Sequence, residues 1–212
     1  MSYLPHLYPV GGVFFITFRL NDSLPQSTLK DLRHTYDQDL KEVKSLKLDS
    51  IKEQERIYNL RKRIFGKYDH QLDVKPYGDC YLNDEAVAKI IWDKIWQYHG
   101  MYYEVIAISI MPNHVHMLLD TSIQIPKGTN IDEAPKDYVE VGEWMKLIKG
   151  GSAYKVNKYL GRKGKLWARE SYDHFARDEA ELDRIRNYII ENPKKAGLAS
   201  VYFDAPFLFS NI

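Results

Sequence analysis

Apolar and polar positions alternate in two different periods along the chain, which indicates both strands and helices. Residues 13–20 form a β-branched and aromatic run after two glycines and are typical of a strand in the interior of a sheet. Between 27 and 65 the apolar positions recur at steps of three and four, at Leu29, Leu32, Tyr36, Leu40 and Val43. This pattern predicts a helical hairpin, with its break near Asp49 and Ser50.

The middle of the chain is predicted to contain one helix and two strands. Residues 66–78 are rich in turn formers, and Asn83 can then cap a helix that continues to about Tyr98. The apolar runs 102–111 and 114–121 are separated only by Pro112 and Asn113. Two strands joined so tightly should be antiparallel neighbours.

The last third of the chain is predicted to alternate helix, strand and helix. After a loop at 122–135 that could be mobile, residues 141–160 have a helical pattern that two central glycines should interrupt, and 166–175 can form an irregular fourth strand. A capping box at 178–181 begins the last helix. We expect this helix to end at Asn192, because Pro193 disfavours helical geometry in the residue before it.

This order of elements is that of a ferredoxin-like, RRM-like α+β sandwich, an antiparallel sheet with helices packed on it. The apolar and aromatic tail to residue 212 should pack onto it. We therefore expect a single domain over 1–212, with a helical insertion at about 27–75 after the first strand.

Composition limits the function classes further. The chain has 212 residues, of which 44% are hydrophobic, and no apolar run reaches the roughly 18 residues of a membrane span. The N-terminus lacks the plan of a signal peptide. Cys80 is the only cysteine, which excludes an intrachain disulfide and a cysteine-based zinc cluster. We expect a cytoplasmic protein without membrane association.

His114 and His116 are the first candidates for chemistry. They lie one residue apart in a predicted strand, so both imidazoles should point to the same face. Such a pair can bind one divalent metal, because imidazole is the commonest metal-binding side chain. The spacing alone leaves a second interpretation open, in which both are hydrogen-bonded residues of the core.

The last helix offers a second half of a site. Tyr188 lies at the edge of its apolar stripe, and Asn192 follows one turn later on the same side. If this helix packs on the histidine strand, a metal held by the histidines, with Asn192 as a possible third ligand, could help Tyr188 attack a phosphate. The alternatives are packing for Tyr188 and local hydrogen bonds for Asn192. Rival nucleophiles are Tyr154, Tyr159 and Tyr172.

Basic residues are concentrated between 146 and 169 although the net charge of the whole chain is only +1. This segment contains tyrosines and a tryptophan, and aromatic rings can stack on unpaired bases while cations neutralise phosphates. The alternative is a solvated helix face. His174 could serve in packing, in phosphate contact or as a proton shuttle. The candidate DNA-binding residues are Lys146, Lys149, Lys155, Lys158, Arg162, Lys165, Arg169 and Arg177.

Four segments in this order resemble the single-tyrosine HUH transposases, and most closely the REP-associated tyrosine transposases of bacteria. They are Met-Pro-Asn-His-Val-His-Met-Leu-Leu (111–119), Gly-Lys-Leu-Trp (164–167), Tyr-Asp-His-Phe-Ala-Arg (172–177) and Tyr-Ile-Ile-Glu-Asn-Pro-Lys-Lys-Ala-Gly-Leu (188–198). The family often has Gly-Thr-Trp at the first strand, for reading a guide tetranucleotide. This chain has Gly12-Val13-Phe14 there instead.

The resemblance implies a function and a site. It implies that His114 and His116 bind Mg²⁺ or Mn²⁺, that Tyr188 is the nucleophile and that Asn192 is a metal ligand. It also implies cleavage and rejoining of single-stranded DNA through a 5′-phosphotyrosine, on hairpins of the repetitive extragenic palindromic (REP) kind. Whether the protein acts as a monomer or a homodimer stays open.

Two other functions are compatible with parts of the pattern. A non-catalytic module could bind single-stranded nucleic acid by stacking alone, but stacking requires neither the histidines nor the Tyr188 and Asn192 pair. A hydrolase could use the histidines to activate water, with Asp120 as the nearby carboxylate on the same strand face. The four side chains taken together favour the transposase.

Overall fold

The structure is a computed structural model that describes residues 9–74, 77–126, 128 and 134–211. The chain divides into two compact units. One comprises Met1–Asn21 and Cys80–Ile212, and the other comprises Asp22–Asp79. The first unit carries the sheet and all the candidate site residues named above.

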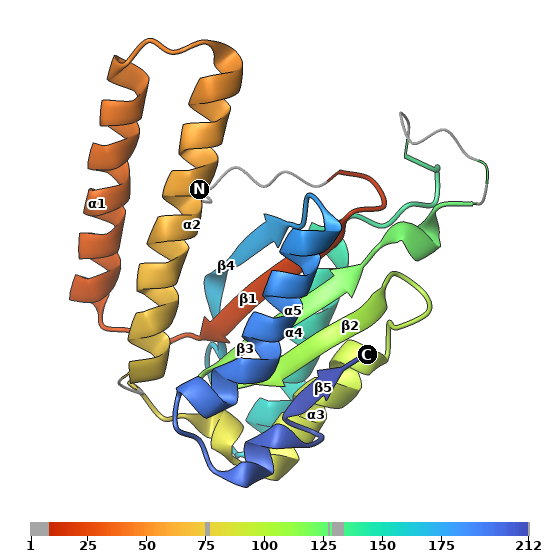
Figure 1. The fold of residues 1–212 in the computed structure, drawn as a ribbon. Coiled ribbons are helices and arrows are strands. Elements are labelled where there is room, and N and C mark those ends of the chain that lie inside the picture. Colours follow the sequence, from red (N-terminus) through yellow and green to blue (C-terminus); the bar gives the residue numbers. More distant parts are fainter. Residues whose placement is uncertain (1–8, 75–76, 127, 129–133, 212) are drawn as a thin grey trace. The chain divides into compact units, whose positions relative to one another are not determined.

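The sheet of the first unit is antiparallel and has five strands in the order β4-β1-β3-β2-β5 (Figure 1). The strands are β1 (Val13–Leu20), β2 (Glu104–Ile110), β3 (His114–Asp120), β4 (Trp167–Phe175) and β5 (Leu208–Ser210). The four predicted strands, the interior position of the first and the antiparallel β2–β3 pair are confirmed. The tail does pack down, and it does so by adding β5 to the edge of β2.

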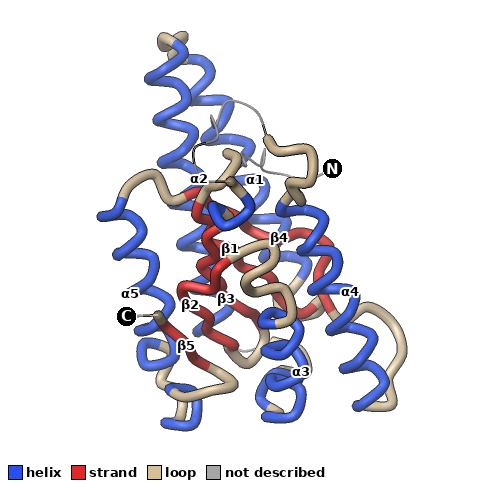
Figure 2. The backbone as a smooth tube through the Cα atoms, turned by 90° about the vertical axis from the view of Figure 1, so that its right-hand side faces the viewer, coloured by secondary structure: helices blue, strands red, loops and turns tan. Residues whose placement is uncertain are grey.

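Helices cover both faces of this sheet. Alternate residues of β1 point to opposite faces, so Phe14, Ile16 and Phe18 lie in the hydrophobic core together with residues of α3 (Glu85–Trp96) and α4 (Val141–Tyr159). The third helix, α5 (Glu179–Lys195), lies against the other face, where it contacts β2 and β3. Figure 2 shows the sheet between α5 and the α3–α4 layer. The α+β architecture is therefore as predicted.

Two details of α3 and α4 differ from expectation. The cap of α3 is Asp84 rather than Asn83, because the carboxylate of Asp84 accepts a hydrogen bond from the amide of Ala86 at 2.8 Å. Helix α4 passes without a break through Gly150 and Gly151. A Cβ atom at Gly151 would meet only the end of the flexible Lys94 side chain of α3, and Gly151 lies beside that side chain.

Helix α5 extends one turn past the predicted end at Asn192. Pro193 lies inside its last turn, where the amide of Ala196 still donates to the carbonyl oxygen of Asn192 at 2.9 Å. The helix stops at Gly197, whose φ of 68° lies in the left-handed region that glycine adopts without strain. The glycine, and not the proline, therefore ends the helix.

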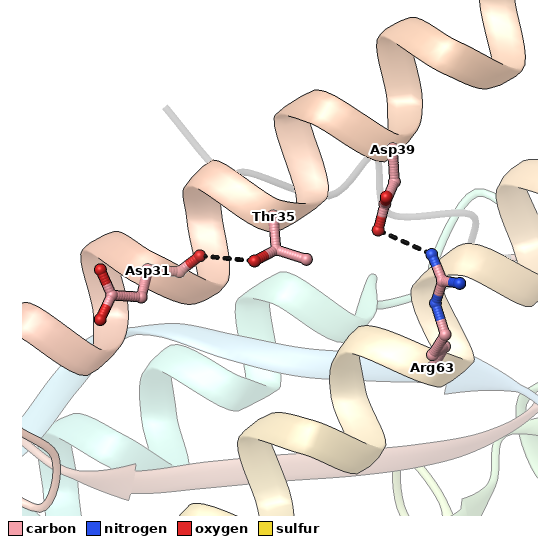
Figure 3. A network of polar contacts seen from close by, with 4 residues as sticks. All are labelled: Asp31, Thr35, Asp39 and Arg63. Carbon is pink, nitrogen blue, oxygen red and sulfur yellow. Dashed lines mark hydrogen bonds and ion pairs between the residues drawn. The ribbon is translucent and has the colours of Figure 1, made fainter.

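The second unit is the predicted helical hairpin. Helix α1 (Gln26–Ser45) and helix α2 (Ser50–Val74) are joined by a short turn where the break was expected. Arg63 of α2 donates to the Asp39 carboxylate of α1 at 2.6 Å, and the Thr35 hydroxyl donates to the Asp31 carbonyl oxygen at 2.9 Å (Figure 3). Contrary to expectation, 66–74 continues α2 instead of forming turns. None of the described helices is long and apolar enough to cross a membrane.

Candidate active site

The two histidines of β3 meet at their Nε2 atoms. His114 and His116 are two residues apart on the strand and point to one face, as predicted, and α5 covers this face. Their Nε2 atoms lie 2.9 Å apart, and the two rings are close to perpendicular, with an interplanar angle of 77°. Both side chains are buried. The strand therefore brings two ring nitrogens to one point.

Neighbouring side chains determine which ring nitrogens carry hydrogen. The side-chain oxygen of Asn113 accepts a hydrogen bond from Nδ1 of His114 at 2.7 Å. The amide group of Asn192 donates from Nδ2 to Nε2 of His116 at 2.8 Å, so the hydrogen of neutral His116 is on Nδ1, which contacts the Thr17 hydroxyl at 2.7 Å. This network assigns both imidazoles as Nδ1–H tautomers with unprotonated Nε2 atoms.

The surroundings of the histidines also favour the neutral form. Burial lowers the pKa of His114 to about 3. Burial lowers the pKa of His116 well below its ordinary value too, and the neighbouring His114 adds to this effect. A neutral imidazole is the form that binds metals, so the protein holds both side chains in that form.

Two unprotonated nitrogens at 2.9 Å fit a shared divalent cation. In these tautomers both Nε2 atoms are unprotonated, so each has a lone pair that can be donated to a cation. Two adjacent ligands about 2.1 Å from an octahedral ion would lie about 3 Å apart. The spacing and chemistry of the pair therefore suit a metal site.

Tyr188 of α5 lies over the same site. Its ring centre is 5.6 Å from that of His116 and 6.0 Å from that of Phe15 of β1, in edge-on geometry. The side chain is half-buried. Within the described part of the chain, no hydrogen bond is made by its hydroxyl group. The phenol is thus held in place by packing, and none of the described residues engages its oxygen.

Helical periodicity places Asn192 next to Tyr188, as predicted. Ile189 is fully buried beneath the helix, and Asn192, one turn after Tyr188, is buried and contacts His116. Two histidines, a phenol and an amide from β3 and α5 therefore converge.

Among the rival tyrosines, only Tyr172 shares this face. It lies on β4 beside Phe15, with ring centres 6.1 Å apart. Tyr154 and Tyr159 are on α4, which packs against the opposite face of the sheet, and are 71% and 53% exposed. Asp120, the carboxylate considered for a hydrolase, accepts a hydrogen bond from the amide of Ser122 at 2.8 Å after the end of β3.

The chain is similar to a curated protein sequence and to a solved structure. A candidate REP-associated tyrosine transposase of Haemophilus influenzae is 29% identical over 105 residues. Half of this chain is homologous to that transposase. The match covers 50% of this chain and spans 57% of the relative's length. No protein-family model matches the chain.

The structural match extends over more of the chain. A solved structure of a REP-associated tyrosine transposase bound to a REP hairpin has 18% sequence identity to this chain and a TM-score of 0.45. The match covers 98% of this chain and 82% of the chain in the solved structure.

Sequence reasoning missed three side chains around the histidines. Thr17 and Phe15 lie on β1, which pairs with β3 in a register that sets Thr17 opposite His116. Asn113 directly precedes His114 and is hydrogen-bonded to its ring. In the sequence, only this adjacency indicates the contact. Such partners orient metal-binding histidines and set their tautomers.

Three of the predicted DNA-binding residues line a cleft on the opposite face of the sheet. Lys146 and Lys149 of α4 and Arg169 of β4 contribute to its walls, and its volume is about 440 Å³. The ammonium group of Lys149 donates to the Arg169 carbonyl oxygen at 3.1 Å and to the Ser171 hydroxyl at 3.2 Å. Burial lowers the pKa of Lys149 to about 8, with Glu170 opposing and Arg19 adding to the shift.

The remaining predicted DNA-binding residues have different surroundings. Lys155, Lys158 and Lys165 are exposed. Arg162 donates to the Asn157 side chain at 2.6 Å and packs over the ring of Tyr81. Arg177 lies in the turn between β4 and α5, where its backbone amide is bound to a glutamate of the helix. These positions therefore do not form one uniform basic face.

Mild acid should destabilise the protein through the histidine pair. In the folded state the pKa of His114 is about 3, whereas unfolded histidine titrates near 6.5. Between these values the unfolded state binds more protons, so this contribution is complete above about pH 6.5 and is lost as the pH falls toward 3. The free energy of unfolding should decrease by up to about 1.4 kcal/mol per pH unit and histidine.

The measurement is urea unfolding with chelator between about pH 7 and pH 4. Wild type is compared with a double variant, His114→Ala with His116→Ala, in which the other titrating groups are unchanged. The free energy of unfolding should decrease more steeply with falling pH in wild type than in the double variant. Parallel curves for the two proteins would show that the pair is not held neutral.

Proposed function

We propose that this protein is a metal-dependent single-strand DNA endonuclease and strand transferase of the REP-associated tyrosine transposase type. The observation that carries the proposal is the convergence of two unprotonated histidine nitrogens with Tyr188 and Asn192. Homology over half of the chain to a candidate member of that family supports it. Both units are taken to belong to one transposase domain, and the DNA is taken to carry a hairpin of the REP kind.

The proposed metal ligands are the Nε2 atoms of His114 and His116 and the side-chain oxygen of Asn192. Imidazole nitrogens with an amide oxygen suit Mg²⁺ or Mn²⁺, with other positions left for water and phosphate oxygens. When bound, the ion would supply positive charge to stabilise the charge that develops on the scissile phosphate. Thr17 and Asn113 orient the two rings for this role.

Tyr188 is the proposed nucleophile. Its oxygen attacks phosphorus and forms a new O–P bond, while the bond from phosphorus to the 3′-oxygen of the preceding nucleotide breaks. The phenol proton passes to solvent, and the departing 3′-oxygen takes up a proton. The products are a 5′-phosphotyrosine and a free 3′-hydroxyl, and one phosphodiester replaces another. The reverse attack by a 3′-hydroxyl therefore rejoins strands without an added energy source.

The cleft between α4 and β4 is the proposed contact for DNA phosphates. Lys149 offers a partly buried ammonium group, held by two hydrogen bonds, and Lys146 and Arg169 lie on the same walls. The exposed Lys155, Lys158 and Lys165, and also Arg162 and Arg177, would add weaker contacts.

Replacing Lys149 with methionine should weaken binding of single-stranded hairpin DNA by about three- to tenfold and reduce the salt dependence of the affinity by about one ion. The cause is loss of one positioned phosphate contact. The matched control is Lys155→Met, an exposed lysine on the same helix outside the cleft, which should change affinity less. Fluorescence anisotropy at several salt concentrations gives both quantities. An equal effect of the two substitutions would contradict a role for the cleft.

The test of the proposed function is covalent attachment. Labelled single-stranded hairpin DNA from the region that flanks the gene is incubated with protein in Mn²⁺ or in chelator and resolved on a denaturing gel. A slow-migrating adduct that requires the ion supports the proposal. Hairpins that bind but are never cut with any divalent ion would overturn the catalytic assignment and leave a nucleic-acid-binding protein.

A further inference from the structure

The corner between β4 and α5 contains a buried contact between a histidine and a glutamate that the proposed chemistry does not use. Nε2 of His174, near the end of β4, lies 3.2 Å from Oε1 of Glu181, in the first turn of α5. The two side chains are only 10% and 5% exposed. A buried carboxyl group loses its contacts with water, so Glu181 depends on polar partners within the protein.

The Glu181 carboxylate joins three parts of the corner. Its second oxygen accepts a hydrogen bond from the backbone amide of Arg177 at 3.2 Å, and the amide of Glu181 donates to the Asp178 carboxylate at 2.7 Å. The end of β4, the turn and the start of α5 are thus tied through one side chain. This arrangement fixes where the helix begins and the direction in which it leaves the sheet.

The same corner lies next to the wall of the candidate active site. His174 pairs in register with Phe15 of β1, and the Phe15 ring packs against both Tyr188 and His116. Glu181 precedes Tyr188 by seven residues, which is two helical turns or about 10 Å along the same side of α5. The start of the helix and its nucleophile therefore face the same layer of side chains.

Among the described residues, polar contacts attach helix α5 to this face on either side of Tyr188. One contact is Glu181 with His174, and another is Asn192 with His116. The second attachment uses Nε2 of His116, the nitrogen proposed to bind the ion. That nitrogen has a single lone pair, so it cannot accept from Asn192 and bind a cation at the same time. The attachment at Glu181 involves no proposed metal ligand.

We propose that His174 and Glu181 are positioning residues that hold Tyr188 in line for attack when the Asn192–His116 hydrogen bond is given up. The inference rests on the proposed function and assigns His174 a role other than phosphate contact or proton shuttle. Its consequence is that the pair affects the rate of attack rather than the binding of DNA or metal.

The experiment measures adduct formation in a single turnover as a function of DNA concentration. His174→Ala and Glu181→Gln should lower the maximal rate about tenfold or more, while the half-saturating DNA concentration and the thermal stabilisation by Mn²⁺ stay within twofold of wild type. His174→Gln, whose amide can still donate to Glu181, should recover part of the rate. The matched control is Glu191→Gln on the exposed side of α5, where the carboxylate pairs with Lys195.

Each outcome bears on one proposal. Wild-type rates in folded Glu181→Gln protein would overturn the positioning role, and so would a rate loss matched by equal losses in DNA and Mn²⁺ binding. If Glu181→Gln does not fold, the comparison of His174→Gln with His174→Ala decides. A wild-type protein that forms no adduct would instead overturn the proposed function.

Discussion

Replacing Tyr188 with phenylalanine is expected to reduce covalent attachment of DNA by about a thousandfold or more, because the attacking oxygen is lost. The phenyl ring can keep its packing against His116 and Phe15. The hydroxyl group has no hydrogen-bond partner among the described residues, so the free energy of unfolding should change by less than about 0.5 kcal/mol. DNA affinity should stay near that of wild type.

The measurement is the denaturing-gel assay with ion present, together with anisotropy for binding. Tyr172→Phe is the matched control, because Tyr172 shares the sheet face and contacts the same phenylalanine. It should still form the adduct. An adduct that persists in Tyr188→Phe and disappears in Tyr172→Phe would show that the nucleophile is Tyr172 of β4.

Removal of either imidazole is expected to remove most of the stabilisation of the protein by divalent ions. At a hundredfold excess of Mn²⁺ over its dissociation constant, binding adds about 2.7 kcal/mol to stability, which corresponds to a rise in Tm of about 5 to 10 °C. His114→Ala and His116→Ala should each lose most of this rise, because each variant keeps only one histidine nitrogen to bind the ion. Adduct formation should fall with it.

The comparison is made within each variant, with Mn²⁺ against chelator, so that any loss of baseline stability does not enter. Asn192→Leu should reduce the shift, whereas Asn192→Asp, which keeps an oxygen ligand, should retain it. A Tm shift in both histidine variants equal to that of wild type would place the ion elsewhere.

Local periodicity accounts for the parts of the site that the sequence could predict. The two-residue period of a strand sets His114 and His116 on one face, and the helical period sets Asn192 one turn after Tyr188; both relations hold in the structure. Their roles in metal binding and catalysis stay predictions. The four longer strands and the helical hairpin followed from equally local patterns.

The features that sequence could not supply depend on contacts between distant residues. Thr17 meets His116 across 99 positions of sequence, and only the register of β1 with β3 reveals it. Strand β5 has three residues, too few for a period. Gly150 and Gly151 favour a helix break by local propensity, yet α4 is continuous through both. In each case the outcome depends on tertiary packing and not on a local period.

The sheet separates the two proposed contacts with DNA. The histidines and Tyr188 lie on the α5 face, whereas the cleft lined by Lys146 and Lys149 lies on the α4 face, and β4 is the edge strand between them. A DNA strand that makes both contacts has to pass around the β4 edge of the sheet. The DNA footprint is then longer than the segment that reacts, so affinity and cleavage would depend on different stretches of the same substrate. Short oligonucleotides could reach Tyr188 without contacting the cleft on the α4 face.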